Sequence, residues 1–275
     1  MVLVTKIDGS RRPFEREKVI RTCMRLRASR EIAEAVADKV ESKLYDGIST
    51  KEILRMIYRY LAEHRPQVKH EVDLRKAICL LRSKPDFEQY IVRLLTALGY
   101  NVLGPQIVRG RCVEHEIDAI AMKNNEAIYV EVKHHLWPHT YTGLDIFLQA
   151  RATFEDLVGG YQLGYNKVPF NRPMVVCNTK LSDHAKRYSN CAQVDHICWK
   201  SPQDNSLEKL IEDYRLYPIT LMKTLDSKSQ ARLGDAGVLL LQELVASDPL
   251  TLSHKTKIPK NKIDKFTRGA QEIIK

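Results

Sequence analysis

Several features that define familiar protein classes are missing from this sequence. No apolar run approaches the roughly 18 residues of a membrane span, and the N-terminus lacks the apolar segment of a signal peptide. The six cysteines are scattered, without a Cys-x-x-Cys pair or the spacing of a disulfide framework. The Walker A sequence of P-loop enzymes is also absent. We therefore expect a cytoplasmic protein with reduced, mostly buried thiols and no membrane partner.

Acidic side chains are outnumbered by basic ones. The chain has 44 Lys and Arg against 34 Asp and Glu, which gives a formal net charge of +10 and an isoelectric point near 9.2. This balance favours a polyanionic partner, most simply nucleic acid. With 275 residues and 44% hydrophobic content, the chain is long enough for two or three small domains.

Residues 1–84 have the pattern of a small, mostly helical domain with a β-hairpin at its front. An apolar alternation ends at Asp8-Gly9, and helical periodicity follows over 15–27, 32–44, 53–62 and 72–81. Three motifs, V-T-K-x-D-G-S-x-x-x-F-x-x-x-K-V, D-G-I-S-T-K-E-I and L-R-K-A-I-C-L-L-R-S-K, resemble in this order the ATP-cone domain. The resemblance implies a regulatory site for ATP or another adenine nucleotide.

The ATP-cone resemblance also implies which residues hold that nucleotide: Val4, Lys6, Lys18, Val19 and Lys84. Lysines suit phosphate as point charges. Ile7 stands where the family usually carries arginine, so one cationic contact is lost. The alternative interpretation is that these lysines form an ordinary solvated face.

The most informative stretch runs from residue 112 to 135. Apolar and polar residues alternate over 113–121, and again over 128–135 after a predicted hairpin turn at 123–126. Two such strands can place Asp118, Glu131 and Lys133 on one surface. A solvated polar strand face would show the same alternation, and this is the alternative.

Carboxylate oxygens suit a hard divalent cation, and a nearby lysine can act on the attacking water in phosphodiester hydrolysis. The sequence Glu-Ile-Asp-Ala-Ile-Ala followed by Tyr-Val-Glu-Val-Lys-His-His resembles the Mrr-type branch of the PD-(D/E)XK nuclease superfamily. This resemblance implies Mg²⁺ or Mn²⁺ held by Asp118, Glu131 and the Val132 carbonyl, with Lys133 beside the water. It also implies supporting roles for Glu88 on the preceding helix and Gln149 on the following one.

The segments around this stretch predict the rest of the central domain. Apolar residues over 173–177 favour a buried parallel strand, and a helix from 178 and a strand over 194–199 follow. We expect a helix over 143–158, ended by Gly159-Gly160. The His- and aromatic-rich loop over 134–141 is expected to lie along DNA.

Residues 221–275 are predicted to be helical and resemble a helix-hairpin-helix module, although the family's hairpin glycine is absent. Lys257, Lys260 and Lys262 would contact the DNA backbone. A dimerisation tail is the equally supported alternative.

Together these observations predict an α/β protein of three domains: an ATP-cone over 1–84, a mixed sheet flanked by helices over 85–220, and a small helical domain over 221–275. The predicted function is a metal-dependent endonuclease acting on double-stranded DNA, regulated by adenine nucleotide, in restriction or DNA repair. The alternatives are a junction-resolving nuclease and a nucleotide-responsive DNA-binding regulator without catalysis. We expect a homodimer or higher homo-oligomer, since such nucleases usually pair to cut both strands.

Overall fold

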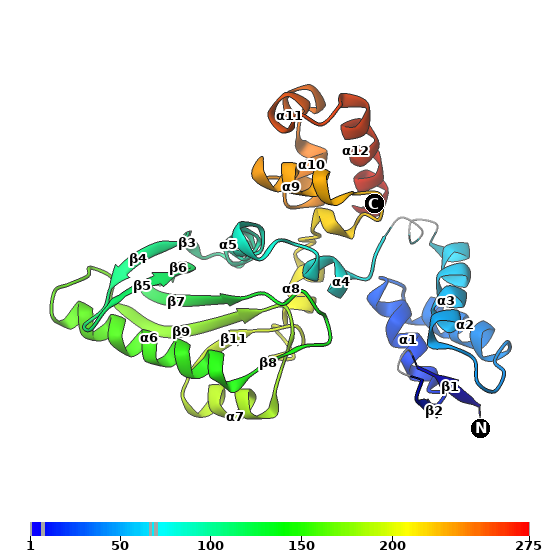
Figure 1. The fold of residues 1–275 in the computed structure, drawn as a ribbon, viewed down its shortest axis with the longest axis horizontal. Coiled ribbons are helices and arrows are strands. Elements are labelled where there is room, and N and C mark those ends of the chain that lie inside the picture. Colours follow the sequence, from blue (N-terminus) through cyan, green and yellow to red (C-terminus); the bar gives the residue numbers. More distant parts are fainter. Residues whose placement is uncertain (1, 7–8, 66–67, 69–70, 275) are drawn as a thin grey trace.

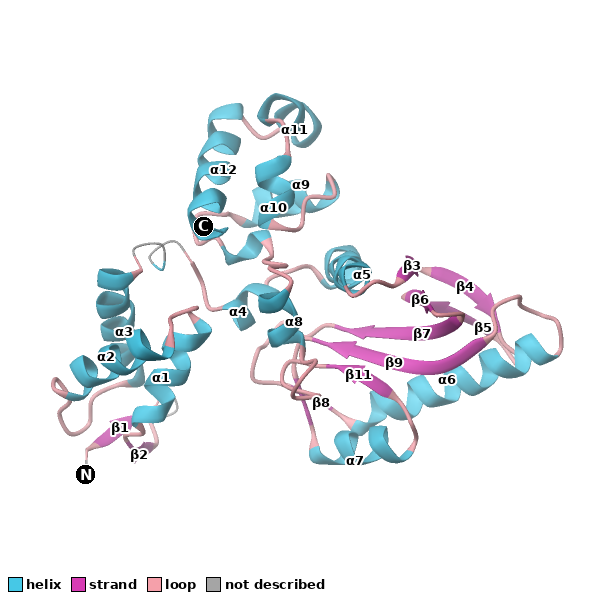
Figure 2. Ribbon diagram, turned by 180° about the vertical axis from the view of Figure 1, so that it is seen from behind, coloured by secondary structure: helices cyan, strands magenta, loops and turns pink. Residues whose placement is uncertain are grey.

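The computed structural model describes residues 2–6, 9–65, 68 and 71–274, which form three lobes (Figure 1). The N-terminal lobe and the C-terminal lobe each adjoin the same end of a central α/β lobe (Figures 1 and 2). The coarse expectation of an α/β protein with a mixed central sheet is confirmed.

The N-terminal lobe is a β-hairpin followed by three helices, as the sequence predicts. Its elements are β1 Leu3–Thr5, β2 Arg11–Pro13, α1 Arg16–Arg25, α2 Arg30–Glu41 and α3 Thr50–His64. The hydroxyl of Ser29 caps α2 by accepting from the backbone N–H of Ile32, and Ser49 caps α3 in the same way. The buried faces of the three helices and β1 form one apolar core. Ile7 and Asp8 lie outside the described residues.

Helix α4 (Leu74–Cys79) packs away from that core. Leu74, Ala77 and Ile78 belong instead to a second core, which also contains side chains of the central sheet and of the C-terminal lobe. The Thr220 hydroxyl donates to the Ala77 carbonyl at 2.7 Å. The fourth helix of the predicted ATP-cone therefore packs with the central and C-terminal lobes.

The central lobe is a five-stranded sheet with helices packed on both faces. Its strands follow the order β11-β9-β7-β6-β3; β7, β9 and β11 are parallel, and β6 is antiparallel to both of its neighbours. Helices α5 and α8 contribute to the core on one face, and α6 and α7 contribute to the core on the other (Figures 1 and 2). The elements of this lobe are η2 Ser83–Phe87, α5 Glu88–Ala97, β3 Asn101–Leu103, β4 Gln106–Arg109, β5 Glu114–Ile117, β6 Ala119–Lys123, β7 Glu126–Lys133, β8 Tyr141–Thr142, α6 Leu144–Gln162, β9 Phe170–Cys177, β10 Lys180–Leu181, α7 Asp183–Cys191, β11 Asp195–Ile197 and α8 Leu207–Asp213.

The hairpin that carries the predicted catalytic residues differs in one respect from the sequence prediction. Its turn has positive φ at Asn124 and Asn125, as expected for a tight hairpin. The first strand, however, breaks at Asp118 into β5, which pairs with β4, and β6, which pairs with β7. Because of the break, Ile117 and Ile120 both face the α6 side, whereas a continuous strand would place them on opposite faces.

Helix α6 is longer than predicted, because Gly159-Gly160 does not end it. A Cβ added at Gly160 would lie 2.6 Å from the Arg109 carbonyl oxygen, so this glycine allows the helix to approach the backbone of β4. The helix ends at Gln162, just before Gly164, whose φ is +77°.

The C-terminal lobe consists of a short 3₁₀ turn and four helices. They are η3 Ile219–Leu221, α9 Ser227–Asp235, α10 Leu241–Ala246, α11 Pro249–Thr256 and α12 Lys260–Ile274. Two sharp turns join helix pairs, one through Gly237 with φ +80° and the other through Lys257 with φ +55°. Arg232 of α9 donates to the Lys257 carbonyl at 2.8 Å, and Lys255 of α11 donates to the Ala236 carbonyl at 2.8 Å. These bonds hold the two turns together.

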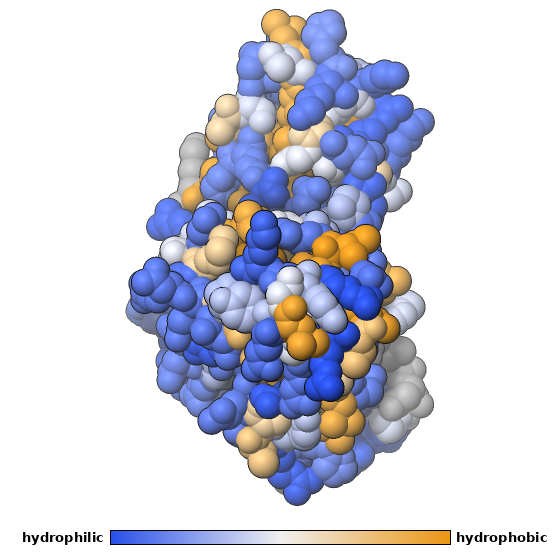
Figure 3. Space-filling view, turned by 90° about the vertical axis from the view of Figure 1, so that its left-hand side faces the viewer, coloured by the Kyte–Doolittle hydropathy of each residue, from blue (hydrophilic) through white to orange (hydrophobic). Residues whose placement is uncertain are grey.

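The surface fits the high content of charged residues. Figure 3 shows a mostly hydrophilic face with small, separate apolar patches. Within the described residues, no helix is both long and apolar enough to cross a membrane.

Candidate active site

Asp118 lies at the break between β5 and β6, where the chain leaves one strand pair and enters another. Its side chain is buried, with 8% of the residue exposed, and its Oδ2 accepts from the backbone N–H of Val132 at 2.7 Å. Ala119 pairs with Val130, so this bond places Asp118 beside the end of β7. Val132 thus meets Asp118 through its N–H, whereas the sequence prediction assigned a role to its carbonyl.

Lys84 and Glu88 complete the surroundings of Asp118. Glu88 starts α5 and is 7% exposed; it lies against Asp118. The ammonium of Lys84 is 3.1 Å from Glu88, 3.0 Å from Glu116 and 3.7 Å from Asp118. Its hydrogen bonds to Glu116 and then to Glu88 raise the pKa of Lys84, which favours the charged amine. Burial raises the pKa of Glu88, and the hydrogen bond from Lys84 partly opposes this effect.

Glu131 and Lys133 follow on β7, on the strand face that α6 covers. The Tyr129 hydroxyl donates to Glu131 Oε2 at 2.6 Å. Burial raises the pKa of Glu131, the negative charge of Asp118 adds to the rise, and the positive charges of Lys133 and Lys84 oppose it. The structure therefore gathers Glu88, Asp118, Glu131 and Lys133 at one end of β7, and we call these residues with Lys84 the carboxylate–lysine cluster.

The cluster does not form a metal site as it stands. Its carboxylate oxygens are of the type that Mg²⁺ and Mn²⁺ prefer. Nevertheless, the described residues contain no group of three or more His, Cys, Asp or Glu side chains arranged to hold a metal ion. The ammonium of Lys84 lies within 4 Å of carboxylate oxygens of Glu88, Glu116 and Asp118.

Gln149 and Lys84 were each predicted to have a specific role. Gln149 is exposed on α6 and makes no hydrogen bond with the cluster in the described part of the chain. Lys84 was predicted to contact nucleotide phosphate, but its contacts are with the carboxylates. Helix α4, which shortly precedes Lys84, lies well away from β1, where Val4 is found (Figures 1 and 2).

The other residues predicted to bind the nucleotide all lie in the N-terminal lobe. Val4 and Val19 are members of its core, while Lys6 and Lys18 are exposed, and Lys18 lies 2.5 Å from Glu15. The sequence prediction overlooked Arg12, which is exposed on β2 directly opposite Val4. Its place in the hairpin, rather than any motif, identifies it as a candidate phosphate contact.

The lysines predicted to contact DNA are distributed around the second turn of the C-terminal lobe. Lys257 and Lys260 are exposed, at the turn and at the start of α12. Lys262 is instead paired with Asp226 at 2.7 Å. Lys257 ends α11 in the left-handed backbone conformation, which glycine usually adopts.

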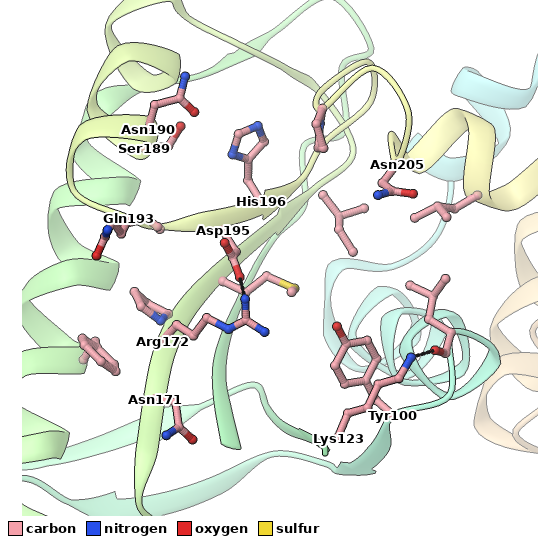
Figure 4. Close-up of a pocket in the computed structure, with 18 of the residues that line it drawn as sticks. Tyr100, Lys123, Asn171, Arg172, Ser189, Asn190, Gln193, Asp195, His196 and Asn205 are labelled. Carbon is pink, nitrogen blue, oxygen red and sulfur yellow. Dashed lines mark hydrogen bonds and ion pairs between the residues drawn. The ribbon is translucent and has the colours of Figure 1, made fainter. Parts of the chain in front are cut away.

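A cavity of about 880 Å³ lies elsewhere on the central lobe and contains none of the predicted catalytic residues. Figure 4 shows Arg172 pointing toward Asp195, 3.2 Å away, within a lining that includes Lys123 and His196. Arg172 also pairs with Glu126 at 2.6 Å. Because its charge is already compensated twice, we do not place the active site in this cavity.

Comparison with known proteins identifies both ends of the chain. Residues 2–86 match the ATP cone domain, which confirms that prediction, and residues 217–274 match the family described as AF1548-like, C-terminal. An uncharacterized protein of Archaeoglobus fulgidus is 33% identical over 157 residues, which span 57% of this chain and 84% of that protein. A second uncharacterized protein of that organism is 46% identical over 41 residues, spanning 15% of this chain and 87% of that protein.

One solved structure is similar over most of the chain. It is described as the crystal structure of a protein of unknown function, AF1548. The match covers 68% of this chain and 96% of the AF1548 chain, with 30% sequence identity and a TM-score of 0.59. None of these relatives has a described activity, so they give no support to the predicted nuclease. The extent and identity of the matches show that the chain belongs to the AF1548-like family, with an ATP cone domain at its N-terminus.

Proposed function

We propose that this protein hydrolyses phosphodiester bonds in DNA under the control of an adenine nucleotide bound to its ATP cone. The observation that carries the proposal is the meeting of Glu88, Asp118, Glu131 and Lys133 at one end of β7. These side chains come from a helix, a strand break and a strand, so the fold and not local sequence brings them together. Buried carboxylates with raised pKa values beside a lysine are characteristic of acid–base sites.

The cluster supplies two of the functions that such hydrolysis needs. Glu131 Oε2 is held by the Tyr129 hydroxyl, which leaves Oε1 to accept a proton from the attacking water. The ammonium of Lys133 can neutralise the charge that builds up on the phosphate oxygens. The water oxygen bonds to phosphorus, the ester P–O bond breaks, and the leaving oxygen takes a proton from solvent.

Lys84 offers a physical route from the ATP cone to this site. It follows α4, which lies within the matched ATP cone sequence yet packs in the core of the central and C-terminal lobes. A nucleotide that prefers one position of α4 over another would move the Lys84 ammonium relative to Glu88 and Asp118. A nucleotide that bound both positions of α4 equally well would leave the equilibrium between them unchanged. Withdrawal of Lys84 would also free carboxylate oxygens for a divalent cation.

A cleavage assay on linear duplex and four-way junction DNA tests the proposal. The full-length protein and its Lys133→Ala variant are compared with and without ATP, in Mg²⁺, in Mn²⁺ and in a chelator. We expect cleavage by the wild type and a loss of about 100-fold or more in the variant. Lys123→Ala, which removes a lysine near the 880 Å³ cavity, is the control and should cleave normally. Equal rates for the wild type and Lys133→Ala would refute the catalytic assignment.

One observation favours a second function, a nucleotide-responsive DNA-binding regulator without catalysis. The Lys84 ammonium fills the centre of the carboxylates, as expected if the cluster only ties α4 to the sheet. In that case ATP would change DNA affinity while no condition of the assay gives cleavage. Pairing of two copies stays a prediction, and gel filtration with and without ATP would measure it.

A further inference from the structure

A second group of cations lies where the ATP cone meets the central lobe, and the proposed function does not use it. Arg75 on α4 is only 8% exposed, yet its guanidinium forms no hydrogen bond or ion pair with any described residue. Its Nε is completely buried and unpartnered, and the group lies over the Trp199 ring at 5.9 Å. The indole Nε1 of Trp199 is likewise buried without a partner. Buried donors of this kind are rare in folded proteins, because each loses its bond to water.

Three other cations surround Arg75. The backbone N–H of Trp199 donates to the Thr179 carbonyl at 3.1 Å, which brings Lys180 to the site, and Lys200 follows Trp199 directly. Arg25, from α1, approaches Asp73 at the start of α4. Burial, followed by the positive charges of Arg75, Lys200 and Arg25, lowers the pKa of Lys180.

Acidic side chains compensate only part of this charge. Asp73 pairs with Arg25 at 3.8 Å, and Glu208 pairs with Lys200 at 2.9 Å. Glu208 Oε1 is buried without a hydrogen-bond partner among the described residues. Arg75 and Lys180 are left without an ion-pair partner in the described part of the chain. Two cations without a direct ion-pair partner, next to unpaired N–H donors, are the chemistry that receives a phosphate group.

Exposed aromatic side chains adjoin the cations. Lys180 of β10 pairs in register with Tyr141 of β8, which is 59% exposed, and Trp137 in the preceding loop is 76% exposed. This loop begins just after Lys133, and the ring of His135 hydrogen-bonds the Thr142 hydroxyl at 3.1 Å. The chain therefore runs from the carboxylate–lysine cluster through two exposed aromatic rings to the cations. Phosphate-binding cations interleaved with exposed rings are typical of proteins that bind an unpaired nucleic-acid strand.

We propose that Arg75 and Lys180 bind a backbone phosphate of an unpaired DNA strand whose bases stack on Trp137 and Tyr141. The inference builds on the proposed function, because it names the substrate form as DNA with a single-stranded segment. Since Arg75 and Arg25 belong to the ATP cone sequence and Lys180 to the central lobe, the site is complete only when the two are docked. Nucleotide-dependent movement of α4 would then change strand binding as well as the carboxylate–lysine cluster.

Fluorescence anisotropy with a labelled oligo-dT strand and a duplex of the same length tests this site. Binding is measured in a chelator, so that cleavage is not needed. We expect the Trp137→Ala and Tyr141→Ala variants each to lose about 5- to 150-fold in affinity for the strand. Lys180→Ala should lower the slope of log affinity against log salt by about 0.7, the value of one phosphate on a single strand. Lys76→Ala, an exposed lysine on the same helix α4, is the control and should leave strand affinity unchanged.

The outcomes separate this inference from the proposed function. Strand binding that depends on these residues, without any cleavage, would support the site and refute only the nuclease. Cleavage with strand binding unchanged in all three variants would overturn the site and leave the nuclease standing. Loss of ATP binding in Lys180→Ala, with strand binding intact, would assign the cations to free nucleotide and overturn the inference. Because Trp137 and Tyr141 are exposed and Lys180 is partly exposed, the test does not depend on folding of an Arg75 variant.

Discussion

Replacement of Lys84 by methionine tests whether this lysine holds the carboxylate–lysine cluster together. Lys84 is 61% exposed, so each of its contacts is screened by water, and a fully screened pair at 4 Å contributes about 1 kcal/mol. The loss of folding free energy in Lys84→Met also has an upper limit, because Glu88 can take up a proton when its partner is removed. For a carboxyl with the ordinary pKa of 4.5, protonation at pH 7 costs about 3.4 kcal/mol, and burial, by raising the pKa of Glu88, makes it less. We therefore expect Lys84→Met to lower the free energy of unfolding by about 1–3 kcal/mol at pH 7.

Urea unfolding of the full chain at pH 7 and at pH 4 measures this effect. Lys209→Met is the matched control, because Lys209 has similar exposure but a single exposed partner, Asp213, at 3.1 Å; its loss should be about 0.5 kcal/mol or less. In Lys84→Met the pKa of Glu88 rises further. The Glu88 carboxyl then contributes fully to stability at a pH below its unfolded-state pKa, and the contribution is lost as pH rises through its raised pKa in the folded state. The deficit relative to the wild type should therefore shrink toward pH 4. Equal losses in the two variants, or a deficit that does not change with pH, would refute the role of Lys84.

Three further predictions concern other parts of the molecule. Gly160→Ala should destabilise the protein by about 2 kcal/mol or more in urea unfolding, because the new Cβ would overlap the Arg109 carbonyl. In the adjacent Gly159→Ala the new Cβ meets only the Arg111 side chain, so a similar loss there would contradict this explanation. Lys257→Gly should raise the melting temperature, because glycine adopts the left-handed backbone without strain, which is worth about 1 kcal/mol. The same variant should lower the slope of log affinity for duplex DNA against log salt by about 1, and a stable variant with an unchanged slope would show that Lys257 does not contact DNA. Burial raises the pKa of Glu131, so its stabilising contribution is full at low pH and is lost as pH rises. Glu131→Gln should therefore reduce the fall in the free energy of unfolding between pH 4 and pH 7. Parallel pH profiles for the variant and the wild type would show that this carboxyl does not titrate as inferred.

Local pattern was enough to predict most elements of this protein. Helical periodicity and the serines before α2 and α3 predicted the N-terminal lobe, and the alternation on either side of Asn124-Asn125 predicted the central hairpin. These features depend on hydrogen bonds and side-chain spacing within a few residues, which a sequence contains directly. The ATP cone resemblance is confirmed for the same reason, because its three motifs are local and fall in order.

Long-range packing decided what the sequence could not. The break at Asp118 arises because β5 and β6 pair with different strands, and α6 continues through Gly159-Gly160 because it lies against β4. Lys84 meets Asp118 across 34 positions only because α4 leaves the N-terminal core. The sequence by itself determined the chain's elements, its basic charge and its N-terminal family. The tertiary structure alone decided which charges meet, since the partner of a buried charge is whichever side chain packing brings within a few ångströms.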